Sequence, residues 1–156
     1  MNLHSSSSNN NDDNEISKTA SDKSPIRILL VDDEPDITSV TKRGLQSNGF
    51  EVDAFTDPAK ALSNFKAGLY DLLLLDIKMP KMNGIEVYQQ MKEIDKKVKV
   101  CFITASEMHY YEEIRKDIFP ILGVKRLIRK PVRIDDLVKD LRDELKSINQ
   151  WLLYLK

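Results

Sequence analysis

Five polar side chains with the chemistry of metal and phosphate sites each stand at or just after the end of a short apolar run in this chain. They are Asp32, Asp33, Asp76, Thr104 and Lys130. Carboxylates suit a hard divalent cation such as Mg2+, which takes one or two of them together with phosphate oxygens. A carboxylate also attacks phosphorus to give an acyl phosphate. A hydroxyl and an ammonium group are suited to the phosphoryl oxygens.

The apolar runs themselves have the length of strands. They cover residues 26–31, 72–75, 98–103 and 124–129. The carboxyl ends of parallel strands meet at one edge of a sheet, and open α/β sheets bind ligands there. Taken singly, an Asp or Thr in such a place is as commonly a turn or cap residue, and a Lys is usually a solvated surface charge. Their joint placement at the same end of successive strands is what predicts a site.

Within this site we expect the carboxylates to have different roles. Asp33 and Asp76 are the candidates for direct metal ligands, and Asp32 for a ligand that acts through a water. The backbone carbonyl of Lys78 is a further candidate, because it lies on the loop just past Asp76. Mg2+ is the expected ion, with Mn2+ as an alternative.

The pattern between residues 25 and 148 alternates strand and helix signals. A further strand is expected at 50–55, and helices at 35–48, 58–68, 85–94, 106–119 (ended by Pro120) and from about 134. Five such units predict an α/β fold in which helices cover both faces of a parallel sheet. The doubly wound, flavodoxin-like order 2-1-3-4-5 places the first and third strands side by side, which would bring Asp32, Asp33 and Asp76 together.

The composition excludes several classes of protein. The 24 Lys and Arg residues balance 25 Asp and Glu residues, so the surface lacks the positive charge of a non-specific nucleic-acid binder. No apolar stretch is long enough to cross a bilayer, and the first residues do not form a secretory signal. Cys101 is the only cysteine and lies in an apolar run, which is typical of a buried small hydrophobe in a reducing compartment. We expect a cytoplasmic protein that does not associate with membranes.

Two terminal segments differ from the central domain at 25–148. Residues 1–24 are rich in Ser, Asn and Asp and are expected to be disordered. Residues 149–156 are expected to be an apolar extension of the last helix. Its apolar stripe repeats every three or four residues, at Val138, Leu141, Leu145, Ile148, Leu152 and Leu155. Homodimerisation through this helix and docking to a partner are both open. The few residues after the domain leave no room for a DNA-binding domain, so we expect no direct DNA binding.

Four segments resemble the receiver domain of two-component response regulators, in its single-domain, chemotaxis-regulator-like form. They are LLVDDEP at 29–35, DLLLLDIKMPKMNG at 71–84, ITA at 103–105 and KP at 130–131. They occur in the family's order and spacing, and the resemblance covers about residues 26–148, or roughly four-fifths of the chain.

The resemblance implies that Asp76 accepts a phosphoryl group from a phosphohistidine on a sensor histidine kinase, with Mg2+ required. It implies that Asp32 and Asp33 are the acidic pair that holds the metal. Thr104 would be the switch hydroxyl that is drawn toward the phosphoryl group. Lys130 would be the lysine of the phosphoacceptor site, joined to Pro131 by a cis peptide bond. The signal would pass to an effector protein.

Leu127 departs from the family pattern. Receiver domains usually carry Tyr or Phe three positions before the lysine, and the rotamer of that ring is coupled to the switch threonine. With Leu127 in this place, we expect phosphorylation to proceed. We also expect the signal to travel through the backbone and the packing of the helix that follows Thr104. Coupling of Asp76 to the face formed by that helix and the last helix should then be weaker.

Three other readings remain open to test. One alternative is a phosphorelay intermediate that passes its phosphate to a histidine phosphotransfer protein. A phosphatase of the haloacid-dehalogenase type also uses a strand-end Asp, but it carries a second Asp two positions later, where this chain has Lys78. A pseudo-receiver that takes no phosphate disagrees with the complete set of Asp33, Asp76, Thr104 and Lys130. We therefore expect that this protein is not an enzyme that turns over free substrates.

Overall fold

A five-stranded parallel sheet forms the centre of the molecule and has the order β2-β1-β3-β4-β5, as predicted. The computed structural model describes residues 24–154, with side chains as far as Lys146. The predictions for residues 1–23 and for the last apolar side chains lie outside the described residues. The strands are β1 (Arg27–Val31), β2 (Glu51–Phe55), β3 (Leu72–Asp76), β4 (Lys99–Thr104) and β5 (Leu127–Arg129).

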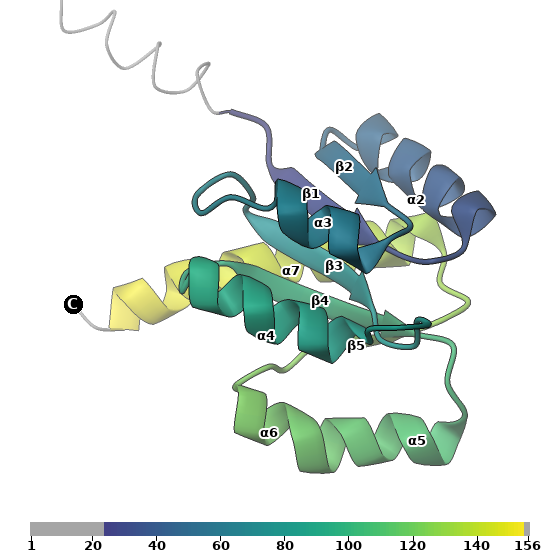
Figure 1. The fold of residues 1–156 in the computed structure, drawn as a ribbon. Helices are drawn as coiled ribbons and strands as arrows, with labels where there is room; N and C mark the ends of the chain where they lie inside the picture. The colour runs from purple at the N-terminus through teal and green to yellow at the C-terminus, as the bar shows by residue number, and fades with distance from the viewer. Residues whose placement is uncertain (1–23, 155–156) are drawn as a thin grey trace, which may run out of the picture.

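Helices cover both faces of this sheet (Figure 1). On one face lie α3 (Pro58–Asn64), α4 (Gly84–Ile94) and a continuous helical segment made of α5 (Met108–Glu113), η1 (Ile114–Ile118) and α6 (Phe119–Leu122). On the other face lie α2 (Pro35–Ser47) and α7 (Ile134–Tyr154). Right-handed crossovers produce this arrangement when strands and helices alternate along a chain.

The central strands β1, β3 and β4 are buried on both sides because their side chains are apolar except at the strand ends. Successive side chains of a strand point to opposite faces, so Leu73 and Leu75 enter the core under α3 and α4, whereas Leu72 and Leu74 enter the core under α2 and α7. Cys101 of β4 belongs to the second core and is fully buried. Burial raises the pKa of its thiol well above the ordinary value, so this cysteine packs as a small hydrophobe.

The helix after Thr104 differs from the prediction at both ends. It begins at Met108 and continues beyond Pro120 to Leu122. Residues 114–118 are π-helical, and the N–H of Phe119 donates to the carbonyl of Ile114. A proline ring collides with the carbonyl four residues earlier in a regular helix, and the wider π turn just ahead of Pro120 removes that conflict. The segment ends where Gly123 adopts a left-handed φ of 69°.

Two further elements, β5 and α3, are shorter than predicted. The fifth strand was expected at 124–129, but β5 has three residues, because the N–H of Val124 donates to the carbonyl of Phe119 at 3.1 Å and so caps α6. The helix expected at 58–68 ends at Asn64. Its C-cap residue Phe65 is extended and places its ring in the core, where it is 6% exposed.

None of the helices in the described part of the chain is both long and apolar enough to span a bilayer.

Candidate functional site

Three carboxylates meet at the carboxyl ends of β1 and β3. The two strands are neighbours in parallel register, with Val31 opposite Leu75, so the residues that follow them lie side by side. Asp32, Asp33 and Asp76 each offer an oxygen, and these oxygens lie within 4.8 Å of one another. Asp32 and Asp76 are buried, whereas Asp33 is half-buried. The sequence prediction that strand order would bring these three residues together is therefore confirmed as a matter of geometry.

Lys130 extends into this group from the end of β5. Its Nζ donates to Oδ2 of Asp32 at 2.6 Å and to Oδ2 of Asp76 at 3.2 Å. Burial lowers the pKa of Lys130, but the hydrogen bonds and charges of the two carboxylates outweigh burial and raise it overall. Lys130 therefore stays protonated. The bond to Pro131 is cis, as the resemblance implied.

Backbone N–H groups fix the other oxygens of the two buried carboxylates. The N–H of Glu34 donates to Oδ1 of Asp32 at 3.1 Å, and the N–H of Lys78 donates to Oδ1 of Asp76 at 3.2 Å. In each case a residue two positions later closes an Asx-type turn, which holds the carboxylate in one orientation. Sequence reasoning assigned Lys78 only a carbonyl, so this N–H donor was missed.

Thr38 is a second residue that sequence reasoning missed. It is buried on α2, and its hydroxyl lies 2.8 Å from the carbonyls of both Asp32 and Glu34. These contacts tie the first turn of α2 to the loop that carries the acidic pair. Its only sequence signal is a threonine four residues after Glu34 on an expected helix, where a hydroxyl can bond back to the carbonyl of the preceding turn.

Asp76 is held in an electrostatically unfavourable place. Burial raises its pKa, the charge of Lys130 lowers it and the charge of Asp32 raises it again, and the result is a pKa of about 6. One ammonium group thus faces two buried carboxylates and a third nearby. A divalent cation with oxygen ligands would relieve this excess of negative charge. The residues present therefore fit a site for such a cation, with a carboxylate available as nucleophile.

Thr104 lies at the end of β4, as predicted, but its hydroxyl bonds to Ser106. The two hydroxyl oxygens are 2.6 Å apart, and the N–H of Ser106 donates to Oγ1 of Thr104 at 3.2 Å. Both side chains are buried. The carbonyl of Thr104 accepts from the N–H of Lys130 at 2.8 Å, which joins the ends of β4 and β5. The switch role expected of Thr104 stays a prediction.

Gly84, at the start of α4, allows that helix to approach Asp76 closely. Its N–H donates to the carbonyl of Ile77 at 2.9 Å. A Cβ atom at this position would collide with the backbone carbonyl of Asp76 itself. The sequence pattern gave no indication of this close approach.

We expect Gly84→Ala to lower the free energy of unfolding by about 1–2 kcal/mol, because the backbone atoms that it would strike cannot move aside without shifting β3 or α4. Urea denaturation followed by circular dichroism measures this change. Gln89→Ala, on the exposed face of the same helix, is the control and should leave stability nearly unchanged. Equal midpoints for the two variants would contradict the assignment.

Leu127 lies half-buried in β5. Its carbonyl accepts a hydrogen bond from the hydroxyl of Tyr111 on α5, at 3.1 Å. Sequence analysis noted the missing aromatic ring at position 127 but gave no attention to Tyr111. The sequence carries no direct signal for this contact, since the two residues meet only through the tertiary fold.

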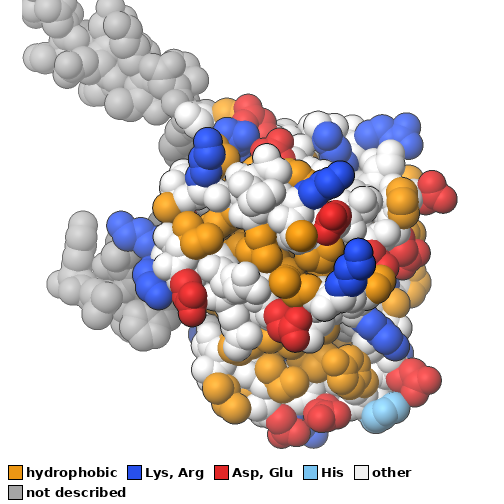
Figure 2. Space-filling model, viewed as in Figure 1, with side chains coloured by type: hydrophobic (Ala, Val, Ile, Leu, Met, Phe, Trp, Pro, Cys, Tyr) orange, Lys and Arg blue, Asp and Glu red, His pale blue; other side chains and the backbone are white. Residues whose placement is uncertain are grey.

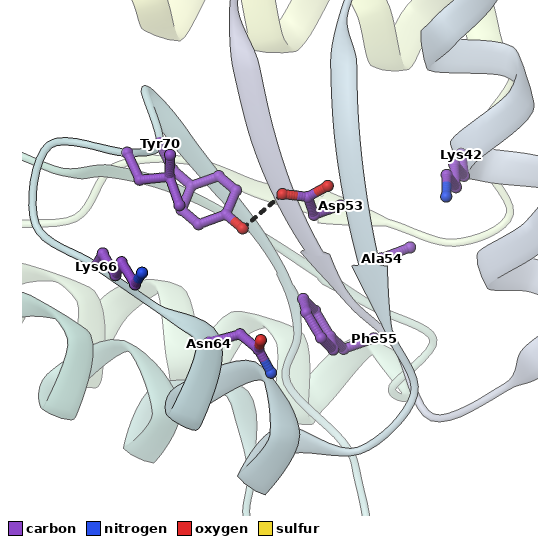
Figure 3. Close-up of a pocket in the computed structure, with 8 residues that line it drawn as sticks. Lys42, Asp53, Ala54, Phe55, Asn64, Lys66 and Tyr70 are labelled. Carbon is purple, nitrogen blue, oxygen red and sulfur yellow. Dashed lines mark hydrogen bonds between the residues drawn. The ribbon is translucent and has the colours of Figure 1, made fainter.

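A separate hollow of about 430 Å3 lies beside β2, the outermost strand at one side of the sheet (Figure 3). It is lined by residues that include Lys42, Asp53, Lys66 and Tyr70. The hydroxyl of Tyr70 donates to Oδ2 of Asp53 at 2.6 Å, as the figure shows. None of the predicted site residues lines this hollow. Asp53 is already bonded to Tyr70 and to Arg27, so its contacts stabilise the edge strand.

Comparisons with known proteins agree with this geometry. The response regulator receiver domain family matches residues 28–142. Transcriptional regulatory protein TrcR of Mycobacterium tuberculosis is 34% identical over 127 residues, which are 80% of this chain and 47% of TrcR. Chemotaxis protein CheY of Treponema pallidum is 34% identical over 126 residues, which are 78% of this chain and 84% of CheY. The chain thus spans about half the length of TrcR.

Solved structures of the response regulator TrrA are similar as well. The structure from Thermotoga maritima in complex with Mg2+ and BeF has a TM-score of 0.64 and 35% identity, and the match covers 76% of this chain and 97% of TrrA. TrrA in complex with the histidine kinase ThkA has a TM-score of 0.64 and 33% identity, covering 78% of this chain and 99% of that one. The family match and the shared fold agree, and the chain belongs to the response regulator receiver domain family.

Proposed function

We propose that this protein is a receiver that accepts a phosphoryl group on Asp76 and signals by binding other proteins. The observation that carries the proposal is the position of the Asp76 carboxylate. One of its oxygens is bonded to Lys130 and the other to the N–H of Lys78, with Asp32 and Asp33 beside it. A pocket with one carboxylate, fixed donors and an acidic pair is suited to phosphoryl transfer, in which the protein contributes mainly positioning and electrostatics.

The transfer itself forms one bond and breaks another. An oxygen of Asp76 bonds to phosphorus, the P–N bond to the histidine of a kinase breaks, and the imidazole nitrogen keeps the electron pair. Lys130 is placed to balance charge on one phosphoryl oxygen, because its Nζ already lies 3.2 Å from the attacking carboxylate. Thr104 would donate its hydroxyl to another phosphoryl oxygen once it leaves Ser106.

A divalent cation, which we expect to be Mg2+, would complete the site and offset negative charge on the phosphoryl oxygens. Asp33 and Asp76 are the proposed direct ligands, since Lys130 contacts Asp32 at 2.6 Å, more closely than the 3.2 Å at which it contacts Asp76. The backbone carbonyl of Lys78 remains the candidate for a further ligand. Mn2+ offers the same oxygen chemistry.

The phosphatase alternative lacks a general acid in the required place. Two positions after Asp76 the chain has Lys78, whose N–H is bonded to Asp76 and whose side chain is exposed. Hydrolysis of free phosphate esters would need a carboxylic acid there to protonate the leaving group. A covalent phosphoryl group on Asp76 without turnover of free substrates is the better supported function.

A sensor histidine kinase is the proposed donor. TrrA, which is similar to this chain along nearly all of its own length, forms a complex with the histidine kinase ThkA. The downstream partner is proposed to be an effector protein, or a histidine phosphotransfer protein if the receiver acts in a relay.

We expect incubation with Mg2+ and acetyl phosphate to add one phosphoryl group, because the pocket supplies the nucleophile and the counter-charge for a small donor as well. Intact-protein mass spectrometry measures the addition. The addition should require the divalent cation, so no mass should be added when EDTA is present before the donor.

Asp76→Asn should abolish the added mass, since an amide cannot form the acyl phosphate. Asp143→Asn, on the exposed side of α7, is the matched control and should be phosphorylated like the parent protein. Phosphorylation that persists in Asp76→Asn would place the acceptor elsewhere, and none in the parent protein would support the pseudo-receiver alternative.

A further inference from the structure

The hydrogen bond between Thr104 and Ser106 links the acidic site to α5. Thr104 has a single hydroxyl proton, and its oxygen already accepts from the N–H of Ser106. If Thr104 turns that proton toward a phosphoryl oxygen, Ser106 must be the donor in the 2.6 Å contact between the two hydroxyls, or that contact is lost. Both residues are buried, so water cannot replace the lost partner without a shift of the chain. Ser106 lies two residues before α5 begins at Met108, so such a shift is passed to that helix.

The helix α5 is held only lightly on the body of the protein. None of its six residues is buried, whereas Ile114 and Phe119 in the segment that follows are both buried. Hydrophobic side chains are exposed over this part of the molecule (Figure 2), and Met108 is 55% exposed. The π-helical turn of η1 separates α5 from α6, and such turns interrupt the regular hydrogen-bond ladder. The lack of buried residues in α5 and the π-helical turn that follows it favour movement of α5 about Ile114.

Two polar side-chain contacts join α5 to β5 in the described part of the chain. One is the 3.1 Å hydrogen bond from the hydroxyl of Tyr111 to the carbonyl of Leu127. The other is a contact of 3.6 Å between Nη1 of Arg129 and the sulfur of Met108, which is exposed and involves a weak acceptor. Tyr111 is half-buried, so its hydrogen bond is the better protected of the two.

We propose that Tyr111 is the positioning residue that holds α5 in the unphosphorylated state and releases it when the acidic site is phosphorylated. Tyr111 thereby supplies from α5 the aromatic coupling that Leu127 cannot supply from β5. The contact is made to the backbone of Leu127, so it does not depend on the side chain at that position. The proposal rests on the proposed function, because occupation of the Asp76 site is what moves Thr104 and Ser106.

The methionines of this chain provide separate reporters for the site and for the helix. Met79 and Met82 lie on the loop that follows Asp76, and Met108 opens α5. We would label the methyl groups of the full-length protein with 13C and add Mg2+ with beryllium fluoride, which mimics a phosphoryl group. Shifts of Met79 and Met82 report occupation of the site, and the shift of Met108 reports movement of α5.

In the parent protein, all three resonances should shift with the same saturation. In Tyr111→Phe, which removes only the hydroxyl, the Met108 resonance should already be displaced toward its bound position before the mimic is added. The ratio of held to released α5 should change about fivefold, the amount that one net hydrogen bond supplies. Because linkage is reciprocal, this variant should also bind the mimic more tightly, by up to about fivefold. A merely structural role for Tyr111 would not tighten binding.

Tyr110→Phe, which removes the neighbouring hydroxyl on the same helix, is the matched control and should behave like the parent protein. If Tyr111→Phe shows the parental Met108 positions and the parental affinity, the proposed role of Tyr111 is wrong. If Met79 and Met82 of the parent protein do not respond to the mimic, the failure lies in the proposed function instead. The two failures are therefore distinguishable in one set of spectra.

Discussion

Replacing Lys130 by methionine will lower the free energy of unfolding of the metal-free protein by about 3–5 kcal/mol at neutral pH. The Nζ of Lys130 lies 2.6 Å from Asp32 and 3.2 Å from Asp76, and both carboxylates are buried. Methionine keeps most of the length of the side chain but leaves two buried carboxylates without their shared counter-charge. The loss is large because each charge left unpaired in a poorly solvated place carries its full desolvation cost.

Denaturation in urea, followed by circular dichroism in the presence of EDTA, measures this loss. Lys139→Met on the exposed face of α7 removes the same charge from the surface and should change stability by less than about 0.5 kcal/mol. Millimolar Mg2+ should restore part of the stability of Lys130→Met, since a divalent cation can replace the missing positive charge. Similar stability for the two variants would show that Lys130 is not the counter-charge of the buried pair.

Asp76→Asn will have the opposite effect and raise the free energy of unfolding of the metal-free protein by about 3 kcal/mol at neutral pH. The folded protein raises the pKa of Asp76 from 3.8 to about 6, first through burial and then through the charge of Asp32, against the attraction of Lys130. The fold therefore disfavours the ionised form of this carboxyl. Asparagine has nearly the same shape and carries no charge, so it relieves the repulsion.

The dependence on pH follows from the direction of this shift. A carboxyl whose pKa is higher in the folded state than in the unfolded state costs stability as pH rises from about 4 to about 6. Asp76→Asn lacks this titration, so its advantage should be small near pH 4 and complete by pH 7. Denaturation at several pH values in EDTA tests the prediction. Asp143→Asn is again the control, and a constant difference across the range would contradict the electrostatic explanation.

The fold was predictable because its signals are local and repeated. The all-apolar run at 72–75 predicted a buried strand between two layers, and its continuation into Asp76 placed that carboxylate at the end of the strand. The order of the strands followed from alternation and handedness. The acidic cluster, in turn, needed only that order, because it is formed by residues at the ends of neighbouring strands.

The details that the sequence did not reveal depend on contacts between distant segments or on competition between hydrogen bonds. Val124 was expected to lie in the fifth strand, but its N–H serves the end of a helix that local propensity placed elsewhere. Pro120 was expected to stop that helix, since the π turn that accommodates it has no recognisable sequence signal. The hydroxyl of Tyr111 meets a backbone carbonyl sixteen residues away, and a carbonyl acceptor leaves no trace in residue type.

The absence of buried side chains in α5 has a consequence for how such a protein can diverge. Core residues constrain one another, so their substitution is limited by stability. The six positions in Met108–Glu113 escape that constraint, although Tyr111 and Met108 contact β5 through a hydrogen bond and a weak sulfur contact. After gene duplication, two copies can therefore acquire different surfaces on this helix while the acidic pocket stays the same. The fold thus lets recognition evolve separately from chemistry.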